Sequence, residues 1–167
     1  IITESLFSMD GDFADLESLC VLAEQYDAHL IVDEAHATGI NGVRGSGRVE
    51  ELGLQERVLC SMHTGGKALG VGGAWIAGDN SLISYLINHC RSFIYSTAPI
   101  PALAAGLLAA VNLRMSEPET ALSLQAKAAR FRERLLELGI IYVDETDRYA
   151  TALSAIGADR IEVVASR

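Results

Sequence analysis

The sequence HLIVDEAH, residues 29–36, passes from a short apolar run into a cluster of polar side chains. The apolar part is rich in β-forming residues and predicts a buried strand that ends at Asp33. Before it, Leu16, Leu19, Ala23 and Tyr26 recur at helical spacing, so a helix is expected to precede this strand. A helix that leads directly into a buried strand is a building unit of α/β folds.

The rest of the chain continues the alternation. Four glycines between residues 35 and 47 predict a loop, and residues 58–62 and 73–77 predict two further strands. Helices are expected from Asp79 or Asn80 to His89 and over residues 101–115, with residues 93–95 extended between them. Ser116 and Glu119 form a capping-box pattern for a last helix through Leu138, with Gly139 at its C-terminal cap.

This order of elements predicts an α/β domain with a mostly parallel sheet and helices on both faces. Such a sheet binds ligands at the carboxyl ends of its strands. The chain opens on Ile1 and Ile2 as though already inside a strand, so we expect it to be part of a longer protein. The composition changes at Ser116, where we place a boundary between a large domain (1–115) and a connecting helix with the start of a small, truncated or divergent C-terminal domain (116–167).

The charge and the cysteines narrow the functional classes. A formal net charge of −9 disfavours a nucleic-acid binder or a membrane-surface binder, since both rely on basic residues. The uncharged stretch 92–113 is interrupted by prolines and is too short to span a bilayer, so it predicts a buried helix. The three cysteines are far apart and suggest no metal site or disulfide framework, which fits a reducing cytoplasm.

Asp33 is the first candidate for chemistry, because it ends an otherwise apolar strand where an α/β sheet binds its ligand. The motif continues with Glu34, Ala35 and His36. Asp33 could equally cap the turn that follows the strand, which is common in α/β proteins. For His36 the corresponding alternative is a loop histidine that bonds to the backbone.

Lys67 is the second candidate. It is one of only two lysines, it follows a predicted strand, and it lies in TGGKALG, residues 64–70. A lysine that attacks a carbonyl works best when it is partly desolvated, and neighbouring glycines allow a bulky ligand to approach the backbone. The alternatives are an incidental lysine in a turn or a phosphate loop, but Ala68 stands where that loop requires Ser or Thr.

Together, a carboxylate after one strand and a lysine after a later strand match the needs of pyridoxal 5′-phosphate (PLP). The aldehyde of this cofactor requires an amine, and its pyridine nitrogen requires an acidic partner to stay protonated. Hydroxyl and amide donors around Thr64, and at Ser96 and Thr97, could bind its phosphate.

Four segments in order resemble the α-oxoamine synthase family of PLP enzymes: TESLFSMDGD (3–12), DEAHATG (33–39), TGGKALG (64–70) and FIYSTAP (93–99). The resemblance covers roughly residues 1–138 and implies the large PLP-binding domain of a fold-type I transferase. It implies a homodimer with a shared active site, which condenses a small amino acid with an acyl-CoA and releases CO2 and CoA.

The resemblance also implies roles for individual residues. Lys67 would carry the cofactor and act as the base that removes the α-proton, Asp33 would pair with the pyridine nitrogen, and His36 would hydrogen-bond the phenolic oxygen. Thr64 would contact the phosphate and Ser8 would lie near the polar edge of the ring. Ser96 and Thr97 would reach the phosphate of the neighbouring subunit; for these two residues and Ser8, plain turn capping is the alternative.

The resemblance fades from Ile140 onward, and the family's ring-stacking histidine and its carboxylate-binding arginine are expected outside this segment. Two other hypotheses therefore stay open. The chain could be a non-catalytic remnant of such an enzyme, or part of another fold-type I enzyme such as an aminotransferase. His29, His63 and His89 are interpreted as structural.

Overall fold

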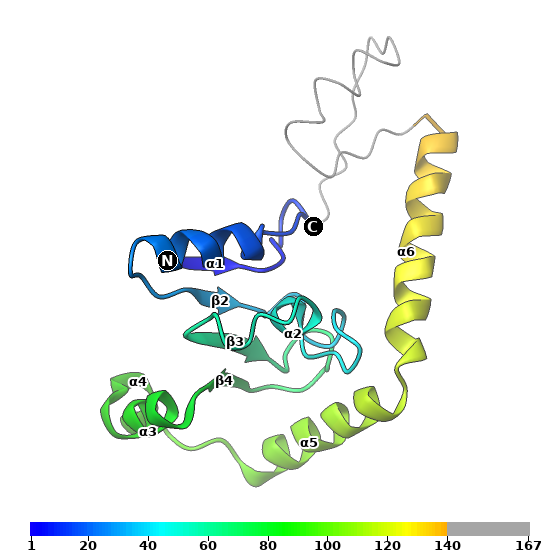
Figure 1. Cartoon of the computed structure of the whole chain (residues 1–167). Helices are drawn as coiled ribbons and strands as arrows, with labels where there is room; N and C mark the ends of the chain where they lie inside the picture. Colours follow the sequence, from blue (N-terminus) through cyan, green and yellow to red (C-terminus); the bar gives the residue numbers. More distant parts are fainter. Residues whose placement is uncertain (140–167) are drawn as a thin grey trace.

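The computed structural model describes residues 1–139. Its centre is one four-stranded sheet in the order β1-β2-β3-β4 (Figure 1), formed by Ile2–Glu4, Ile31–Asp33, Cys60–Thr64 and Ala74–Gly78. β1, β2 and β3 are parallel, and β4 returns antiparallel beside β3. The α/β class and the mostly parallel sheet are therefore confirmed.

Six helices belong to the described residues: α1 Leu16–Gln25, α2 Arg48–Glu51, α3 Asn80–His89, α4 Arg91–Ile94, α5 Pro101–Ser116 and α6 Glu119–Glu137. Aspartates begin two of them: the side chain of Asp15 accepts from Ser18 N at the start of α1, and that of Asp79 accepts from Leu82 N at the start of α3. Such caps satisfy backbone donors that have no partner within the helix. No described helix has the length and apolar character needed to cross a membrane.

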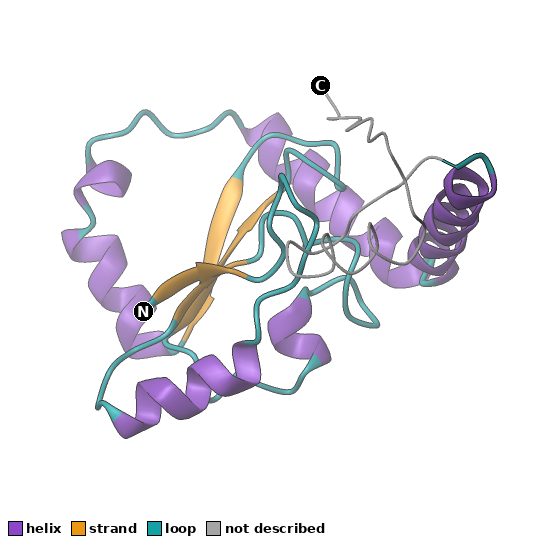
Figure 2. Ribbon diagram, turned by 90° about the horizontal axis from the view of Figure 1, so that it is seen from above, coloured by secondary structure: helices purple, strands orange, loops and turns teal. Residues whose placement is uncertain are grey.

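The main core lies between α1 and one face of the sheet, as Figure 2 shows from above. Helical spacing places Leu16, Cys20 and Ala23 on the inner side of α1, where they pack with Val32 of β2 and with Leu30 just before that strand. Burying one leucine side chain stabilises the fold by about 2 kcal/mol. Val49 and Leu54, from α2 and the turn after it, complete the same cluster.

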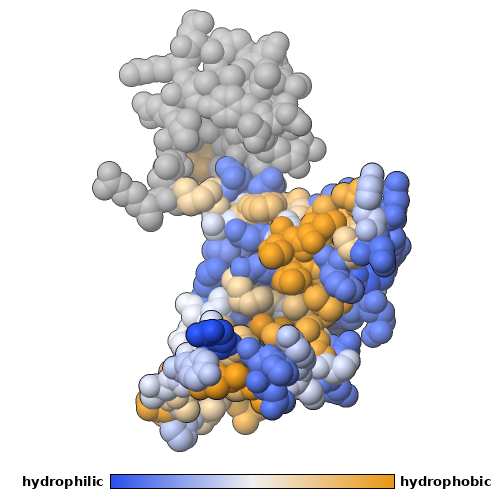
Figure 3. Space-filling model, turned by 90° about the vertical axis from the view of Figure 1, so that its left-hand side faces the viewer, coloured by the Kyte–Doolittle hydropathy of each residue, from blue (hydrophilic) through white to orange (hydrophobic). Residues whose placement is uncertain are grey.

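The opposite face of the sheet is covered less fully. The side chain of Leu82 on α3 lies beside Gly78 and Cys60 at one end of β3 and β4. Ile2 on β1 and Ile76 on β4 share that face by register, and they are 78% and 42% exposed. Apolar surface is also exposed on the side of the molecule that carries α3 and α4 (Figure 3).

A buried carboxylate ties the end of β2 to its surroundings. Glu34 is fully buried and accepts hydrogen bonds from Ser5 Oγ at 2.6 Å, Arg48 N at 3.0 Å and Val49 N at 2.6 Å. A Cβ atom at Gly47 would lie 2.6 Å from this carboxylate, so the approach of α2 depends on a glycine there. Glu34 thus joins β2 to the segment after β1 and to the first turn of α2.

A second buried network holds β3 to the turn after β2. Thr38 Oγ1 donates its single proton to Glu34 O, so it accepts from Nδ1 of His63 at 2.9 Å. Ser61 Oγ then donates to Nε2 at 2.8 Å, and the imidazole stacks on Trp75. Burial holds the pKa of His63 below its ordinary value, although the carboxylates of Glu34 and Asp33 act in the opposite direction. The structural interpretation of His63 is confirmed.

Three predictions of local structure are wrong. The helix predicted to be buried is not, because none of the residues of α5 is buried. Residues 93–95 do not form an extended piece: the amides of Phe93 and Ile94 donate to Cys90 O in the single turn of α4. Three residues with β-propensity have no neighbouring strand to pair with there, so local bonds prevail. Ser116 does not cap α6 either; it ends α5, its hydroxyl donates to Leu113 O, and Pro118 occupies the cap position.

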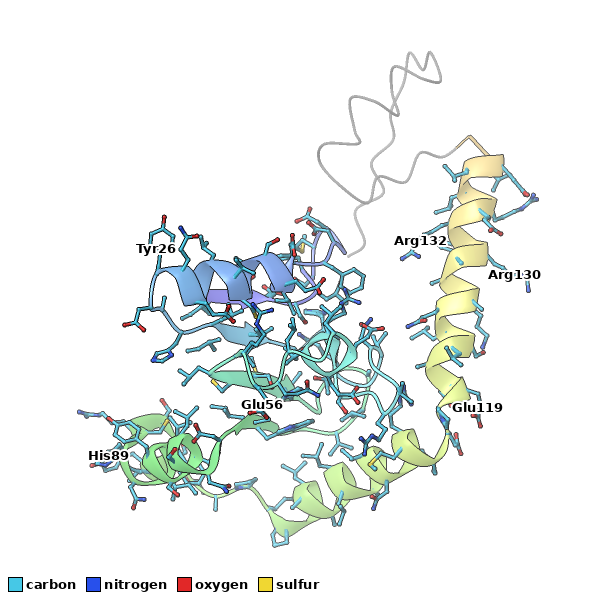
Figure 4. All side chains as sticks on the ribbon, viewed as in Figure 1. Tyr26, Glu56, His89, Glu119, Arg130 and Arg132 are labelled. Carbon is cyan, nitrogen blue, oxygen red and sulfur yellow. The ribbon has the colours of Figure 1, made fainter. Side chains whose placement is uncertain are left out.

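The boundary at Ser116 stays a prediction. α5 ends there, and α6 extends away from the sheet with polar side chains such as Glu119 and Arg130 projecting from it (Figures 1 and 4). Gly139 adopts φ +71° after the last turn of α6, which fits the expected C-terminal cap. The remainder of the predicted small domain, 140–167, lies outside the described residues.

Replacing Glu34 with alanine is expected to destabilise the fold by about 3 kcal/mol, because two backbone donors and one hydroxyl lose their buried acceptor. Urea unfolding followed by circular dichroism measures the change. The matched control is Glu56→Ala, since Glu56 is exposed. Equal unfolding midpoints for the two variants would show that the Glu34 network contributes little.

Stability is expected to fall as the pH drops below about 6.5. His63 has a lower pKa in the folded state than in the unfolded chain. Between these two pKa values the unfolded chain binds more protons than the folded state, so the free energy of unfolding decreases as the pH falls. Urea midpoints at pH 7.5 and 5.5 test this. His63→Gln should flatten the pH dependence, whereas replacing the exposed His29 with Gln should leave it unchanged.

Candidate functional site

The parallel register of β2 and β3 brings two predicted site segments to one edge of the sheet. Asp33 is in register with Met62, and the amide of Glu34 donates to Met62 O at 2.8 Å. Thr64 ends β3 two residues later, so the loop with Lys67 leaves the sheet beside the turn that carries Asp33 and His36. This is the carboxyl end of the parallel strands, where the sequence predicted the site.

Asp33 uses one carboxylate oxygen for local structure. Its Oδ1 accepts from the amide of Ala35 at 2.8 Å, which is the turn-capping bond considered as the alternative interpretation. Within residues 1–139, Oδ2 has no hydrogen-bond partner, and the side chain is only partly buried. The capping role and a ligand-binding role can therefore coexist, because they use different oxygens.

His36 lies in the turn after β2, and its side chain is half-buried. The amides of Ala37 and Thr38 both donate to Glu34 O, so the turn that presents His36 is closed by backbone bonds. The Glu34 carboxylate attaches this turn to the start of α2, because it accepts from the amides of Arg48 and Val49. Asp33 and His36 thus belong to one rigid segment rather than to a free loop.

Lys67 lies on a closed loop between β3 and β4. Gly65 N donates to Gly73 O at 2.9 Å, Val71 N donates to Gly65 O at 2.8 Å, and Gly70 N donates to Lys67 O at 3.0 Å. The side chain of Lys67 is exposed. The partial desolvation expected for a reactive lysine is therefore not provided by residues 1–139, since no described segment covers this side of the loop.

The two glycines before Lys67 have different roles. A Cβ atom at Gly65 would lie 2.4 Å from Val71 O, so this glycine is required by the packing of the loop itself. A Cβ atom at Gly66 would meet only the hydroxyl of Thr64, at 3.6 Å. Only Gly66 therefore has the open surroundings that the approach of a ligand to the backbone needs.

The Thr64 hydroxyl is partly committed. It donates to Gly73 O at 3.2 Å and accepts from the amide of Gly66 at 3.2 Å. The hydroxyl has one proton, so it would have to release Gly73 O before it could donate to a bound phosphate. Its free lone pair cannot bind the phosphate, because an anion needs donors. The amide of Gly66 is the other donor at this position.

The remaining candidates fall into two groups. Ser8 is exposed in the turn after β1, at the same edge of the sheet as Asp33. Ser96 and Thr97 are exposed and follow α4, which lies near the opposite end of the sheet because β4 runs antiparallel (Figure 1). Ser96 Oγ donates to Ser92 O, which is the predicted capping alternative. The structure does not bring Ser96 or Thr97 to Lys67.

Sequence reasoning missed the residues that support the site. Glu34 belongs to the segment DEAHATG, but neither the motif nor the family resemblance predicts a role for it. No sequence pattern distinguishes it, because Glu34 stands among polar residues between Asp33 and His36 and its backbone donors are distant in sequence. Arg114, near the end of α5, donates to the carbonyl of Gly39 at 2.8 Å and was not singled out by any pattern.

The described residues contain no group of three or more metal-ligating side chains, and all three cysteines are free. The edge that carries Asp33 and Lys67 offers one amine, one imidazole, several hydroxyl or amide donors, and one carboxylate with an oxygen that has no partner among residues 1–139. These groups can bind a flat, anionic, electrophilic molecule.

Known proteins resemble this chain over most of its described length. A family model described as aminotransferase class I and II matches residues 1–152. The 8-amino-7-oxononanoate synthase of Anaeromyxobacter sp. (strain K) is 45% identical over 139 residues, which cover 83% of this chain and 35% of that protein. The chain thus spans about a third of the length of the curated relatives it matches.

Solved structures share the fold. The 8-amino-7-oxononanoate synthase from Francisella tularensis matches with a TM-score of 0.75 and 28% identity, covering 87% of this chain and 43% of that one. A structure described as SPT with a PLP internal aldimine matches with a TM-score of 0.78 and 26% identity, covering 84% and 35%. By sequence and by fold, the chain belongs to the aminotransferase class I and II family.

Proposed function

We propose that this chain is the cofactor-binding part of a PLP-dependent α-oxoamine synthase, an acyltransferase that condenses a small amino acid with an acyl-CoA and releases CO2 and CoA. The observation that carries the proposal is the register of β2 and β3, which puts Asp33 and the Lys67 loop side by side. Relatives named 8-amino-7-oxononanoate synthase support the acyl-transferring activity.

The residues at the edge fit this cofactor. Lys67 presents an exposed amine after the open glycine Gly66, and Asp33 retains one carboxylate oxygen without a partner among residues 1–139. When bound, PLP supplies an aldehyde for covalent attachment and a protonated ring that accepts electrons from the reacting carbon. A structural neighbour binds PLP.

Each residue then has a definite task. Lys67 would hold the cofactor, and its Nζ would accept the α-proton of the substrate. Asp33 keeps the pyridine nitrogen protonated through its free oxygen, and the Ala35 amide on the other oxygen fixes the direction of the carboxylate. His36 donates to the phenolic oxygen. Thr64 and Ser8 contact the phosphate and the polar edge of the ring.

Ser96 and Thr97 are proposed to act on a second subunit. They are exposed and lie near the other end of the sheet from Lys67, so within one chain they cannot contact the same phosphate. In a homodimer with a shared active site, the exposed segment after α4 of one subunit would meet the Lys67 loop of its partner. The bond from Ser96 Oγ to Ser92 O would then be exchanged for one to the phosphate.

The family description keeps one other function in view, an aminotransferase, since the matching model covers class I and II aminotransferases. Product analysis separates the two. A synthase releases CoA from an acyl-CoA in the presence of an amino acid, whereas an aminotransferase converts a keto acid to an amino acid without CoA release. A cytoplasmic location stays a prediction.

Incubation with PLP followed by borohydride reduction is expected to leave a pyridoxyl group on Lys67. Peptide mass mapping locates the group, and Lys67→Ala should abolish it, whereas Lys127→Ala should leave it unchanged because Lys127 lies exposed on α6. A pyridoxyl group on Lys127 alone would argue for the remnant hypothesis. So would the absence of any pyridoxyl group together with a failure of the protein to bind PLP.

Asp33→Asn is expected to retain labelling at Lys67 but to lower synthase turnover on the order of 10²-fold, because a neutral amide cannot keep the pyridine nitrogen protonated. CoA release measures turnover. The control is Asp27→Asn, at an exposed position with φ +48° that asparagine tolerates. Normal turnover in the Asp33 variant would refute the assignment of Asp33.

A further inference from the structure

One side of α5 supports the Lys67 loop. A Cβ atom at Gly65 would lie 2.8 Å from Leu107 Cδ1, and one at Gly106 would lie 3.3 Å from Val71 Cγ1. Leu103 lies in ordinary contact range of Gly72. Leu103, Gly106 and Leu107 are three and four residues apart, so they form one stripe of the helix that packs on the base of the loop.

Arg114 continues this stripe two turns further along α5, but its contact is polar. Its Nε donates to Gly39 O at 2.8 Å and its Nη2 lies 3.4 Å from Gly42 O. The stem of the side chain crosses Gly45 so closely that a Cβ atom there would lie 2.9 Å from Cγ and Nε of Arg114. The half-buried guanidinium therefore clamps the turn formed by residues 39–45.

The other side of this turn touches the residue that follows Lys67. A Cβ atom at Gly39 would lie 2.9 Å from Ala68 Cβ and 3.4 Å from Leu69 Cδ2. The amide of Gly39 donates to Gly45 O, which keeps the turn closed. Arg114, Gly39 and Ala68 thus form a continuous series of contacts that ends at Lys67.

Packing alone leaves the loop room to move. A cavity of about 630 Å³ is lined by Gly39, Ala68 and Leu69 together with Arg114 and the start of α6. Ala68 and Gly39 therefore have unfilled space on one side. The hydrogen bonds from a charged guanidinium, which are stronger than those of neutral donors, oppose a shift into this space.

We propose that Arg114 is a positioning residue for Lys67: it holds the turn at residues 39–45 against Ala68 and thereby fixes the loop that presents the lysine amine. The importance of that amine rests on the proposed function. Arg114 itself contacts neither Asp33 nor Lys67. Its effect passes through Gly39 and Ala68, so its loss changes where the amine lies rather than its chemical nature.

The test uses two variants and two measurements on the whole chain. Arg114→Met keeps the length of the stem but removes every donor, whereas Arg114→Lys keeps one charged donor for Gly39 O. Hydrogen–deuterium exchange of residues 65–73 reports on the loop without any cofactor, because Gly65, Gly70 and Val71 donate its closing bonds. The rate of reductive PLP labelling at Lys67 reports on the position of the amine.

In Arg114→Met, exchange over residues 65–73 should rise about tenfold and labelling of Lys67 should slow about tenfold, while α1 and β2 stay protected. In Arg114→Lys, both the exchange rate and the labelling rate should lie between those of Arg114→Met and those of the native protein. The control is Arg130→Met, at an exposed arginine on α6 (Figure 4), which should change neither measurement.

Two results would overturn the inference: unchanged exchange in Arg114→Met, or faster exchange with an unchanged labelling rate, since Arg114 would then be only structural. A native protein with no label on Lys67 is a different outcome. It contradicts the proposed function and removes the role of Lys67 on which this inference rests, whatever the exchange data show for the loop.

Discussion

The buried carboxylate of Glu34 is the constraint on which the rest of the structure depends. A carboxyl group inside the fold is tolerated only when hydrogen-bond partners surround it, and here two backbone amides and a serine hydroxyl do so. Those donors come from the segment after β1 and from α2, so satisfying one charge also assembles three parts of the chain. The turn with Asp33 and His36 inherits its rigidity from that requirement, and the His63 network adds a second attachment to β3.

The sequence predicted the helices and strands whose apolar residues recur at regular spacing, and it predicted the polar side chains at the ends of strands. Asp33 and Lys67 could be placed at one edge because parallel strands present their carboxyl ends together. Residues 93–95 and Ser116 could not be placed, because a single turn depends on which backbone partners lie nearby. Glu34 and Arg114 were beyond pattern reasoning for a related reason: their donors and acceptors are distant in sequence and meet only after folding.

The site is only partly enclosed by the described residues. The base of the Lys67 loop is closely packed, while the lysine itself is exposed. The hydroxyls of Thr64 and Ser96 are both engaged with backbone carbonyls, so each would exchange an internal bond for one to a ligand. This chain spans about a third of the length of its curated relatives, and its described residues line one side of the candidate site. The proposed second subunit would cover another side.

The antiparallel return of β4 has a consequence for how this region tolerates changes in chain length. The chain leaves the sheet at Thr64 and re-enters it at Ala74, beside the strand that it has just left. Bonds from Gly65 N to Gly73 O and from Val71 N to Gly65 O close the loop between them, so an inserted or deleted residue has two possible effects: it changes this closure, or it moves the pairing of β4. A shift of that pairing by one position would turn Trp75 to the other face, away from the imidazole on which it stacks. A change of length between Thr64 and Trp75 is therefore compatible with the Trp75–His63 stacking only where the loop takes it up.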